Sequence, residues 1–130
     1  MEKTLFLLFN HRITTAQEAD ARKSLGVERI VDLPRDLKTL WCQIPAELEE
    51  IAEYLEPVTD WLGTYSRNGD YALIQGDFGA CYIMVNFAFK KGLVPVYSTT
   101  RREVFEEQDG GGAVKMTHRF EHQIFRKYGL

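Results

Sequence analysis

The sequence predicts an α/β protein with a mainly parallel sheet flanked by helices and a C-terminal β-hairpin. Short apolar runs alternate with segments of helical pattern through residues 1–100. A glycine-containing turn, Gln75–Gly79, joins one of these runs to an apolar helix. The run Asp109–Gly112 separates two alternating segments, as in a hairpin loop. We therefore expect a single domain over residues 1–130, with a βα core in 1–100 and a hairpin extension in 101–130.

The first part of the chain contains two predicted strands and a helix between them. The apolar run Leu5–Phe9 is predicted as a central strand, because strands buried on both faces are apolar throughout. Thr14 or Thr15 is predicted to cap a helix that ends at Gly26, with a glutamate at position 18 for a capping box. The second strand follows over Val27–Leu33.

Two helical segments are predicted before the third strand. The first is a short helical piece over Asp36–Trp41. Pro45 opens a stronger helix, because proline is preferred in a first turn and apolar residues recur on one face at positions 48, 51, 52 and 55. Pro57 interrupts or restarts this helix, since proline clashes with the preceding turn, and the apolar face continues to Tyr65.

The third strand and its helix form the centre of the predicted fold. Tyr71–Ile74 is a short apolar run, and it stops at Gly76. Asp77 is a suitable N-cap for the helix that ends at Gly92. The free N–H groups at the start of such a helix can hold a phosphate, and a purely structural turn is the equal alternative.

The last predicted elements are a fourth strand and a hairpin. Leu93–Tyr97 is predicted as a strand near an edge of the sheet, because Pro95 cannot donate a ladder hydrogen bond. Ser98–Arg102 is predicted as the loop after it. Strands over Val104–Gln108 and from Val114 to about Ile124 form the hairpin.

The predicted strand order is 2-1-3-4, which puts a topological switch point between the first and third strands. Ligands of open α/β sheets bind outside the carboxyl ends of the strands at such a point. Three segments would meet there: Asn10–Arg12, Gln75–Asp77 and, one strand over, Ser98–Arg102. Their imidazole, hydroxyl, amide and guanidinium groups suit a phosphodiester or nucleotide better than an apolar ligand.

The composition limits the partners of the chain. A formal net charge of −3 argues against a protein that coats duplex nucleic acid. No segment approaches a membrane span or a signal-peptide core, so we expect a cytoplasmic protein without a membrane partner. Cys42 and Cys81 are isolated, which indicates neither a zinc site nor a disulfide framework. We expect no metal and no cofactor, since Asp77 alone does not make a two-metal site.

Short motifs spread over nearly the whole chain resemble those of one family. The motifs are Leu8-Phe9-Asn10-His11, Leu25-Gly26-Val27, Tyr54-Leu55-Glu56-Pro57, Gly69-Asp70-Tyr71, the segment from Gln75 to Ala80, the segment from Pro95 to Arg102, and the residues Phe120, His122, Phe125, Arg126 and Tyr128. Together they resemble the small standalone CRISPR-associated proteins of type III systems, which are related to CARF (CRISPR-associated Rossmann fold) domains. The resemblance implies a homodimer with a Rossmann-like, CARF-like fold that binds cyclic oligoadenylate. It further implies a ring nuclease that linearises this messenger, with cyclic tetra-adenylate favoured, and switches off the type III response.

The implied reaction needs no metal. A ribose 2′-hydroxyl attacks the neighbouring phosphorus, which gives a 2′,3′-cyclic phosphate and a free 5′-hydroxyl. Arg101 or Arg102, with the N–H groups near Gly76–Gly79, would stabilise the charge on phosphate. His11 would move the proton, with His122 as the substitute. The expected ligand-binding residues are Asn10, Gln75, Gly76, Asp77, Phe78, Gly79, Ser98, Thr99 and Thr100.

Other functions fit the same residues. The pocket could sense or sequester the messenger without cutting it, since binding and cleavage use the same groups. A flavodoxin-like mononucleotide protein and a structural adaptor are further alternatives. His11 at a strand end more often just bonds a loop carbonyl, and Arg101 and Arg102 can equally form a solvated strand edge.

Overall fold

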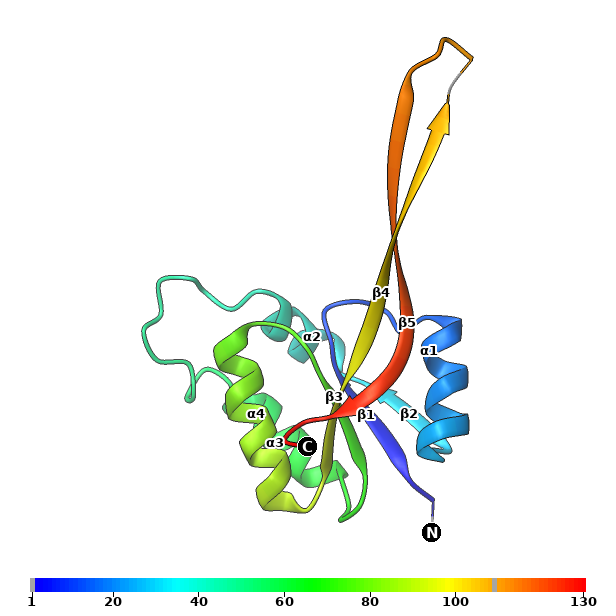
Figure 1. The fold of residues 1–130 in the computed structure, drawn as a ribbon. Coiled ribbons are helices and arrows are strands. Elements are labelled where there is room, and N and C mark those ends of the chain that lie inside the picture. Colours follow the sequence, from blue (N-terminus) through cyan, green and yellow to red (C-terminus); the bar gives the residue numbers. More distant parts are fainter. Residues whose placement is uncertain (1, 109) are drawn as a thin grey trace.

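The computed structural model describes residues 2–108 and 110–130, without the side chains of residues 103, 105, 107 and 117–119. One sheet contains β1 (Thr4–Leu8), β2 (Arg29–Asp32), β3 (Tyr71–Ile74), β4 (Val94–Gln108) and β5 (Val114–Lys127). Its strand order is β2-β1-β3-β4-β5, so the predicted order 2-1-3-4 is confirmed (Figure 1). The first four strands are parallel, and β5 pairs antiparallel with β4. The predicted α/β class with a mainly parallel sheet is therefore confirmed.

Helices cover both faces of the sheet. The helices are α1 (Thr15–Asp20), which continues as a π-helical segment over Ala21–Leu25, α2 (Arg35–Cys42), α3 (Glu56–Tyr65) and α4 (Phe78–Lys91). α1 lies on one face, and α2, α3 and α4 lie on the other (Figure 1). Among the described residues, none of these helices combines the length and the apolar composition that crossing a bilayer requires.

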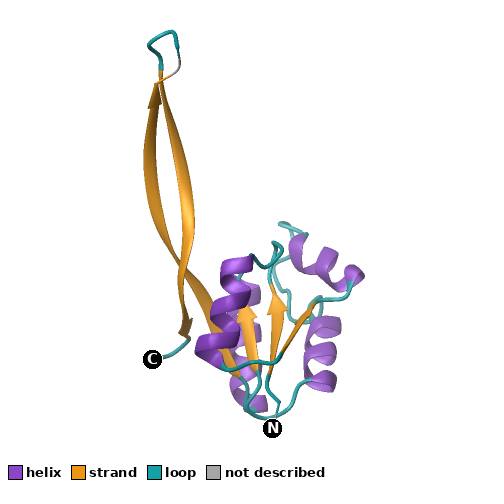
Figure 2. Cartoon of the chain, turned by 90° about the vertical axis from the view of Figure 1, so that its right-hand side faces the viewer, coloured by secondary structure: helices purple, strands orange, loops and turns teal. Residues whose placement is uncertain are grey.

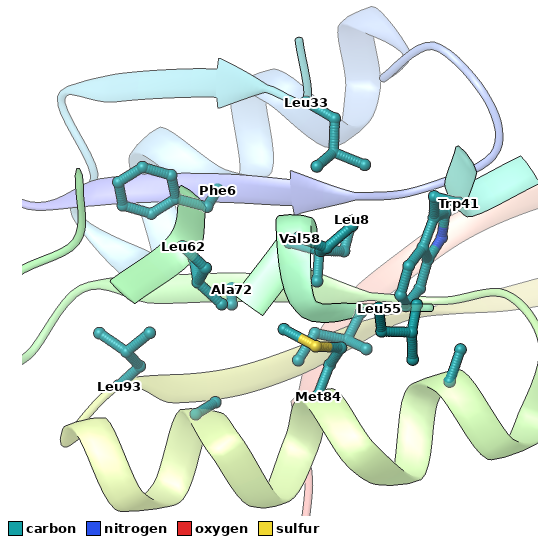
Figure 3. Packing of buried hydrophobic residues seen from close by; sticks show 13 residues of the cluster. Phe6, Leu8, Leu33, Trp41, Leu55, Val58, Leu62, Ala72, Met84 and Leu93 are labelled. Atoms are coloured by element: carbon teal, nitrogen blue, oxygen red, sulfur yellow. The ribbon is translucent and has the colours of Figure 1, made fainter. Parts of the chain in front are cut away.

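Each face of the sheet has its own apolar core. On the α4 side, Met84 of α4 and Leu62 of α3 pack against Phe6 and Ala72 of the sheet (Figure 3). On the α1 side, the core is formed by Leu5, Leu7, Phe9, Ala21, Val27, Leu73, Val96 and Phe125. β1 supplies side chains to both cores, which explains its continuous apolar run. Full burial of each such leucine stabilises the fold by about 1.5–3 kcal/mol.

The helix caps follow the sequence signals. Thr14 caps α1, and its hydroxyl accepts a hydrogen bond from the Gln17 N–H (3.1 Å). The capping box is completed by the Gln17 side chain and not by Glu18, because Gln17 occupies the third helical position after Thr14. Gly26 ends this helical region with φ 68°, in the left-handed conformation that glycine adopts without strain.

The helix predicted from Pro45 is wrong. Residues 43–55 contain no helix, and α3 begins only at Glu56. Pro57 lies in the first turn of α3, where its missing N–H costs nothing, but a helix continuing from Pro45 would bring its ring against the carbonyl of Glu53, four residues earlier. The apolar residues of the irregular segment still reach the core, since Leu55 is fully buried and Ile51 packs against the same cluster.

The loop predicted over Ser98–Arg102 is also wrong. β4 runs without a break from Val94 to Gln108, because β5 supplies antiparallel partners beyond Tyr97. β4, with Pro95, therefore lies between β3 and the edge strand β5, one strand in from the edge of the sheet. A boundary at residue 100 would cut through this continuous strand.

Beyond the body of the domain, β4 and β5 form a projecting two-stranded ribbon (Figure 2). We call residues 101–108 and 114–121 the arm. At its base the register shifts, since Ser98 pairs with Phe125 but Thr100 pairs with His122. Three steps along β5 thus match two along β4, which is a β-bulge on β5. Because of this extra residue, His122 and Phe125 both face α1.

Candidate functional site

Gln75 joins four elements at the carboxyl end of β3. Its N–H donates to the Leu8 carbonyl at the end of β1 (3.0 Å). Its carbonyl accepts a hydrogen bond from Trp41 Nε1 of α2 (3.0 Å), and its side-chain Oε1 accepts one from the Ser98 N–H of β4 (2.7 Å). Two of the three segments expected to meet, those of Gln75 and Ser98, are thus in contact, and the first strand joins them through Leu8, ahead of Asn10–Arg12.

On the α1 side, Ser98 begins a chain of hydrogen bonds. Its Oγ lies 2.5 Å from Nδ1 of His122, and Nε2 of His122 lies 2.6 Å from Oδ2 of Asp20. Asp20 also accepts a hydrogen bond from Ser24 (2.5 Å). Gln17 Nε2 donates to Ser98 Oγ (3.3 Å). The chain therefore links α1 to both strands at the base of the arm.

The neighbouring bonds determine where the protons of this chain lie. Because Oε1 of Gln17 accepts from the Thr14 N–H, its other side-chain atom is the Nε2 that donates to Ser98. Ser98 then uses its own hydrogen toward Nδ1 of His122. The neutral imidazole consequently carries its hydrogen on Nε2 and donates it to the carboxylate of Asp20. Ser98, His122 and Asp20 thus have the hydrogen-bond order of a Ser-His-Asp triad, with the two ring nitrogens exchanged.

Burial decides what this chain can do. Ser98 is 7% exposed, and the side chain of His122 is 5% exposed. Both ring nitrogens of His122 are engaged within the protein, and its ring also packs against Phe125 at 4.5 Å between centroids. The geometry therefore suits a positioning function, in which His122 fixes Ser98 and, through it, Gln75.

The acidic end of the chain is held in its charged form. The hydrogen bond from Ser24, followed by that from His122, holds the pKa of Asp20 below its ordinary value, against the opposing effect of burial. A charged Asp20 is the stronger acceptor for the His122 N–H. The carboxylate of Asp20 thus stabilises the tautomer derived above.

The segment after β1 has a different environment. His11 and Asn10 are exposed, and the His11 ring lies edge-on to Phe9 with 5.5 Å between centroids. Backbone contacts fix the segment, since Lys38 Nζ donates to the His11 carbonyl (3.2 Å) and Cys42 Sγ to that of Asn10 (3.8 Å). The imidazole of His11 is therefore presented at the surface, beyond the end of β1 and near α2.

The remaining predicted residues of β4 lie at the base of the arm. Thr99 is engaged in the bulge, where its hydroxyl donates to the Ile124 carbonyl (3.2 Å) and accepts from the Ile124 N–H (3.1 Å). Thr100, Arg101 and Arg102 are exposed. The structure thus separates these residues from the buried pair of Ser98 and His122, although all come from neighbouring positions of the two strands.

The glycine-containing turn is shaped by Trp41 and Asp77. A Cβ on Gly76 would lie 2.9 Å from Trp41 Nε1, so the indole ring requires glycine there. Asp77 caps α4, because its Oδ2 accepts a hydrogen bond from the Ala80 N–H (3.0 Å). The predicted cap is confirmed, and the carboxylate of Asp77 thereby faces the first turn of α4.

On the α4 side, the carboxyl end of β3 opens into a groove with a volume of about 740 Å³. Gln75, Gly76 and Phe78 of the predicted residues line it. The other lining residues are Cys81, Tyr82, Val85, Asn86, Phe89, Tyr97, Arg126, Lys127, Tyr128, Gly129 and Leu130. Phe78 is 95% exposed and Tyr82 is 72% exposed. We call this cavity the α4 groove; its volume lies in the range of small-molecule sites.

The floor of the α4 groove is rigid and its rim is cationic. Tyr128 donates its hydroxyl hydrogen to the Ile74 carbonyl (2.6 Å), and burial raises the pKa of Tyr128 to about 12. Its ring lies 4.9 Å from that of Tyr97 between centroids. Arg126 donates to the Tyr97 hydroxyl (3.0 Å) and lies over the same ring, and Lys127 follows it in the lining. The groove thus combines aromatic faces with guanidinium and ammonium groups.

The described part of the chain offers few side chains that could bind a metal ion. No group of three or more His, Cys, Asp or Glu side chains there could hold a metal ion. Cys42 is exposed, and Cys81, beneath the α4 groove, has its pKa raised by burial.

Sequence reasoning missed two sets of residues. The α4 groove depends on Tyr82, Asn86 and Phe89, which continue from Phe78 at helical spacings of three and four. That spacing is visible in the sequence, but the apolar residues of this segment predicted a helix buried on all sides, so no exposed aromatic face was expected. The partners of His122 on α1 carry no such signal, because Asp20 lies 102 positions away.

The fold and the two sides of the site define an α/β domain with an open, mainly parallel sheet and a groove at the carboxyl end of its strands. The chain belongs to the Uncharacterized protein MJ1673 family, whose sequence model matches residues 3–126. It is similar to a protein of Methanocaldococcus jannaschii described as "Uncharacterized protein MJ1673", with 45% identity over 124 residues that cover 95% of each chain. No solved structure is significantly similar to the chain.

Proposed function

We propose that the protein is a ring nuclease that binds cyclic oligoadenylate, with cyclic tetra-adenylate preferred, and linearises it without a metal. The observation that carries the proposal is the α4 groove, in which aromatic rings, amides and cations line one cavity. The ligand class comes from the resemblance to CARF-related proteins, which rests on sequence motifs alone. The CRISPR setting of the reaction has the same basis.

Adenine rings would bind on the aromatic side of the α4 groove. Phe78 and Tyr82 lie one turn apart on α4 and expose most of their surface. Stacking of a base on an aromatic side chain stabilises binding by about 1–3 kcal/mol. Asn86 and Gln75 supply amides that can bond the edges of a base or a ribose hydroxyl.

Phosphates would bind on the cationic side. Arg126 and Lys127 line the α4 groove opposite α4. The backbone N–H groups of Phe78 and Gly79 lie at the start of α4. They carry partial positive charge, which would also attract a phosphate. Arg101 and Arg102, exposed at the base of the arm, are proposed to contact the phosphate that is cleaved.

The proposed chemistry is attack by a ribose 2′-oxygen on the adjacent phosphorus. The 2′-oxygen forms a bond to phosphorus, and the bond from phosphorus to the 5′-oxygen breaks. His11 accepts the proton of the 2′-hydroxyl, solvent water gives a proton to the leaving 5′-oxygen, which becomes a free hydroxyl, and His11 returns its proton to solvent. In this proposal His122 is a positioning residue, since it orients Ser98, which in turn holds Gln75.

A second candidate is a protein that binds the same ring without cutting it. The observation in its favour is that both nitrogens of His122 are already engaged within the protein. Of the two histidines whose side chains the structure describes, His11 and His122, only the exposed His11 would then be available to move a proton.

Product analysis tests the proposal directly. The protein is incubated with rings of four and six adenylates in the presence of EDTA, and products are resolved by chromatography and mass. We expect linear products with a 2′,3′-cyclic phosphate, and faster loss of the four-membered ring. Binding without linear products would favour the second candidate, and absence of binding to either ring would overturn both.

Variants then assign the residues. We expect cleavage to fall by about 100-fold or more in His11→Ala, and by about 10- to 100-fold in Arg101→Ala, Arg102→Ala or Arg126→Ala. Tyr65→Ala is the matched aromatic control, because Tyr65 is 66% exposed and does not line the α4 groove. Unimpaired cleavage in His11→Ala together with the three arginine variants would refute the assignment.

A further inference from the structure

The side chain of Gln75 can only donate hydrogen bonds to a ligand in the α4 groove. The backbone N–H of Ser98 is a donor, so the side-chain atom that it contacts at 2.7 Å is the acceptor Oε1. The backbone carbonyl and N–H of Gln75 are bonded to Trp41 and Leu8. Within the described part of the chain, Nε2 of Gln75 has no hydrogen-bond partner. Gln75 lines the groove and therefore offers it N–H groups and no free acceptor.

The hydroxyl of Tyr97 has the same polarity. Arg126 donates to the Tyr97 oxygen (3.0 Å), so the hydroxyl hydrogen of Tyr97 points away from the guanidinium. The ring of Tyr97 lies 4.9 Å from that of Tyr128, whose hydroxyl bonds the carbonyl of Ile74, the residue before Gln75. The donors of Tyr97, Arg126 and Gln75 therefore border the same part of the α4 groove, at the carboxyl end of β3.

The charges around the α4 groove favour an anion. Arg126 and Lys127 line it, and among the described residues of its lining there is no Asp or Glu. This contrasts with the whole chain, in which acidic residues outnumber basic ones by 19 to 16. The nearby Asp77 is not part of the lining, because its carboxylate caps α4 through the Ala80 N–H. Donors and cations without a carboxylate suit a ligand group with several anionic oxygens.

We propose that Nε2 of Gln75, the hydroxyl of Tyr97 and the guanidinium of Arg126 form a phosphate-binding subsite of the α4 groove. The non-bridging oxygens of a phosphate only accept hydrogen bonds, and each of these three groups has a hydrogen to donate. Of the two amides in the groove, Gln75 is thereby assigned to phosphate, and Asn86 is left to the base or the ribose.

The ligand class is a nucleotide, because the same groove offers a surface for a base. Phe78 and Tyr82 are 95% and 72% exposed, and exposed aromatic rings stack on bases of any sequence. The inference deepens the proposed function and rests on its use of the α4 groove. It concerns the binding of one nucleotide and does not require that a ring is cut.

Calorimetric titration with AMP and with adenosine tests the subsite. The two ligands share the base and the ribose and differ in the phosphate, so we expect AMP to bind about 10- to 100-fold more tightly than adenosine. Inorganic phosphate should compete with AMP and leave the affinity for adenosine unchanged. AMP that binds no more tightly than adenosine, or not at all, would overturn the proposal.

An isosteric variant identifies the donor. Gln75→Glu keeps an oxygen for the Ser98 N–H and replaces the amide nitrogen by a second carboxylate oxygen. We expect its affinity for AMP to fall by about 100-fold through like-charge repulsion, and its affinity for adenosine to stay within about 2-fold. Tyr97→Phe removes one neutral donor and should weaken AMP binding by about 3- to 10-fold.

Gln123→Glu is the matched control for Gln75→Glu. Gln123 is exposed and does not line the α4 groove, and the variant makes the same change in net charge. Its affinity for AMP should stay within about 2-fold of the wild-type value, since an exposed charge outside the groove is screened by salt. Unchanged AMP binding in Gln75→Glu, or an equal loss in Gln123→Glu, would overturn the assignment of Gln75.

Nuclear magnetic resonance of the wild-type chain covers the case in which Gln75→Glu does not fold. The side-chain N–H resonances of Gln75 should shift on addition of AMP and stay in place on addition of adenosine. Resonances that respond equally to both ligands would also overturn the proposal.

The two proposals fail in different experiments. A protein that prefers AMP to adenosine but leaves both rings intact would retain the phosphate subsite and lose the nuclease activity. A protein that cuts the rings but binds AMP and adenosine equally would retain the activity, and its phosphate contacts would lie outside this subsite.

Discussion

The two faces of the sheet differ at the carboxyl end of β3 and the adjoining part of β4 around Ser98. On the α1 face, polar side chains are buried and joined in a chain, and Ser98 is only 7% exposed. On the α4 face, aromatic side chains are left in solvent, and Phe78 is 95% exposed. Buried polar groups are stable when each has a partner, whereas exposed aromatic groups remain available to a ligand. The α1 face therefore holds the site in place, and the α4 face is the side that can bind.

Replacement of His122 should give the largest difference between the faces. His122→Ala leaves Asp20 and Ser98 without their shared partner in a buried position, and it removes the ring packed on Phe125. We expect the free energy of unfolding to fall by about 2–3 kcal/mol. Tyr82→Ala on the α4 face should change it by less than about 0.5 kcal/mol, because Tyr82 is 72% exposed. Urea denaturation of both variants measures the contrast, and equal losses would contradict it.

A smaller effect is expected at Gly76, where the two faces meet. Gly76→Ala would put a Cβ 2.9 Å from Nε1 of the buried Trp41, so the indole or the turn must shift. We expect a loss of about 1–2 kcal/mol in the free energy of unfolding.

Gly79→Ala is the control for Gly76→Ala. An added Cβ at Gly79 meets no neighbour closer than 3.4 Å, and alanine is the better helix former in the first turn of α4. Thermal denaturation should therefore show an unchanged or slightly higher midpoint for Gly79→Ala. A loss equal to that of Gly76→Ala would show that the turn, and not the contact with Trp41, sets the effect.

The smallest effect is a pH dependence on the α1 face. The pKa of Asp20 is lowered in the folded state, so its contribution to stability is complete above the unfolded value of about 4 and is lost as pH falls through the folded value. Asp20→Asn keeps an oxygen that accepts from the His122 N–H, and it should lower stability at pH 7 by less than about 1 kcal/mol.

The fall in stability at acid pH distinguishes the wild-type chain from Asp20→Asn. Between pH 5 and pH 3, stability measured by urea denaturation should fall more steeply for the wild-type chain than for Asp20→Asn, because the variant has no carboxylate at this position to protonate. An equally steep fall in both proteins would mean that the hydrogen bonds of Asp20 do not depend on its charge.

Much of the fold follows from local signals in the sequence. The run Tyr71–Ile74, the cap at Asp77 and the glycine at position 92 define β3 and α4 almost to the residue. The helix predicted from Pro45 to Leu55 was wrong, because apolar residues at helical spacing also occur in an irregular segment that packs on a core. Periodicity alone does not distinguish the two.

The site was harder to predict, because its contacts are distant in the sequence. Gln75 after β3 and Ser98, then taken to follow the fourth strand, were identified from topology, and Gln75 does bond Ser98. That β4 would continue through Ser98 depended on β5, whose pairing begins nearly thirty residues later. The chain through His122 required a bulge as well, and no local pattern signals a bulge.

The bulge on β5 has a consequence for how the length of the chain can vary. In a regular strand, side chains three positions apart point to opposite faces, so His122 and Phe125 share a side only because of the inserted residue. Removing Gln123 would leave His122 and Phe125 two positions apart, and regular strand alternation would then keep both side chains on the α1 side without a bulge. A one-residue deletion at the base of the ribbon should therefore preserve the contact of the imidazole with Asp20, as should changes in length at the far turn.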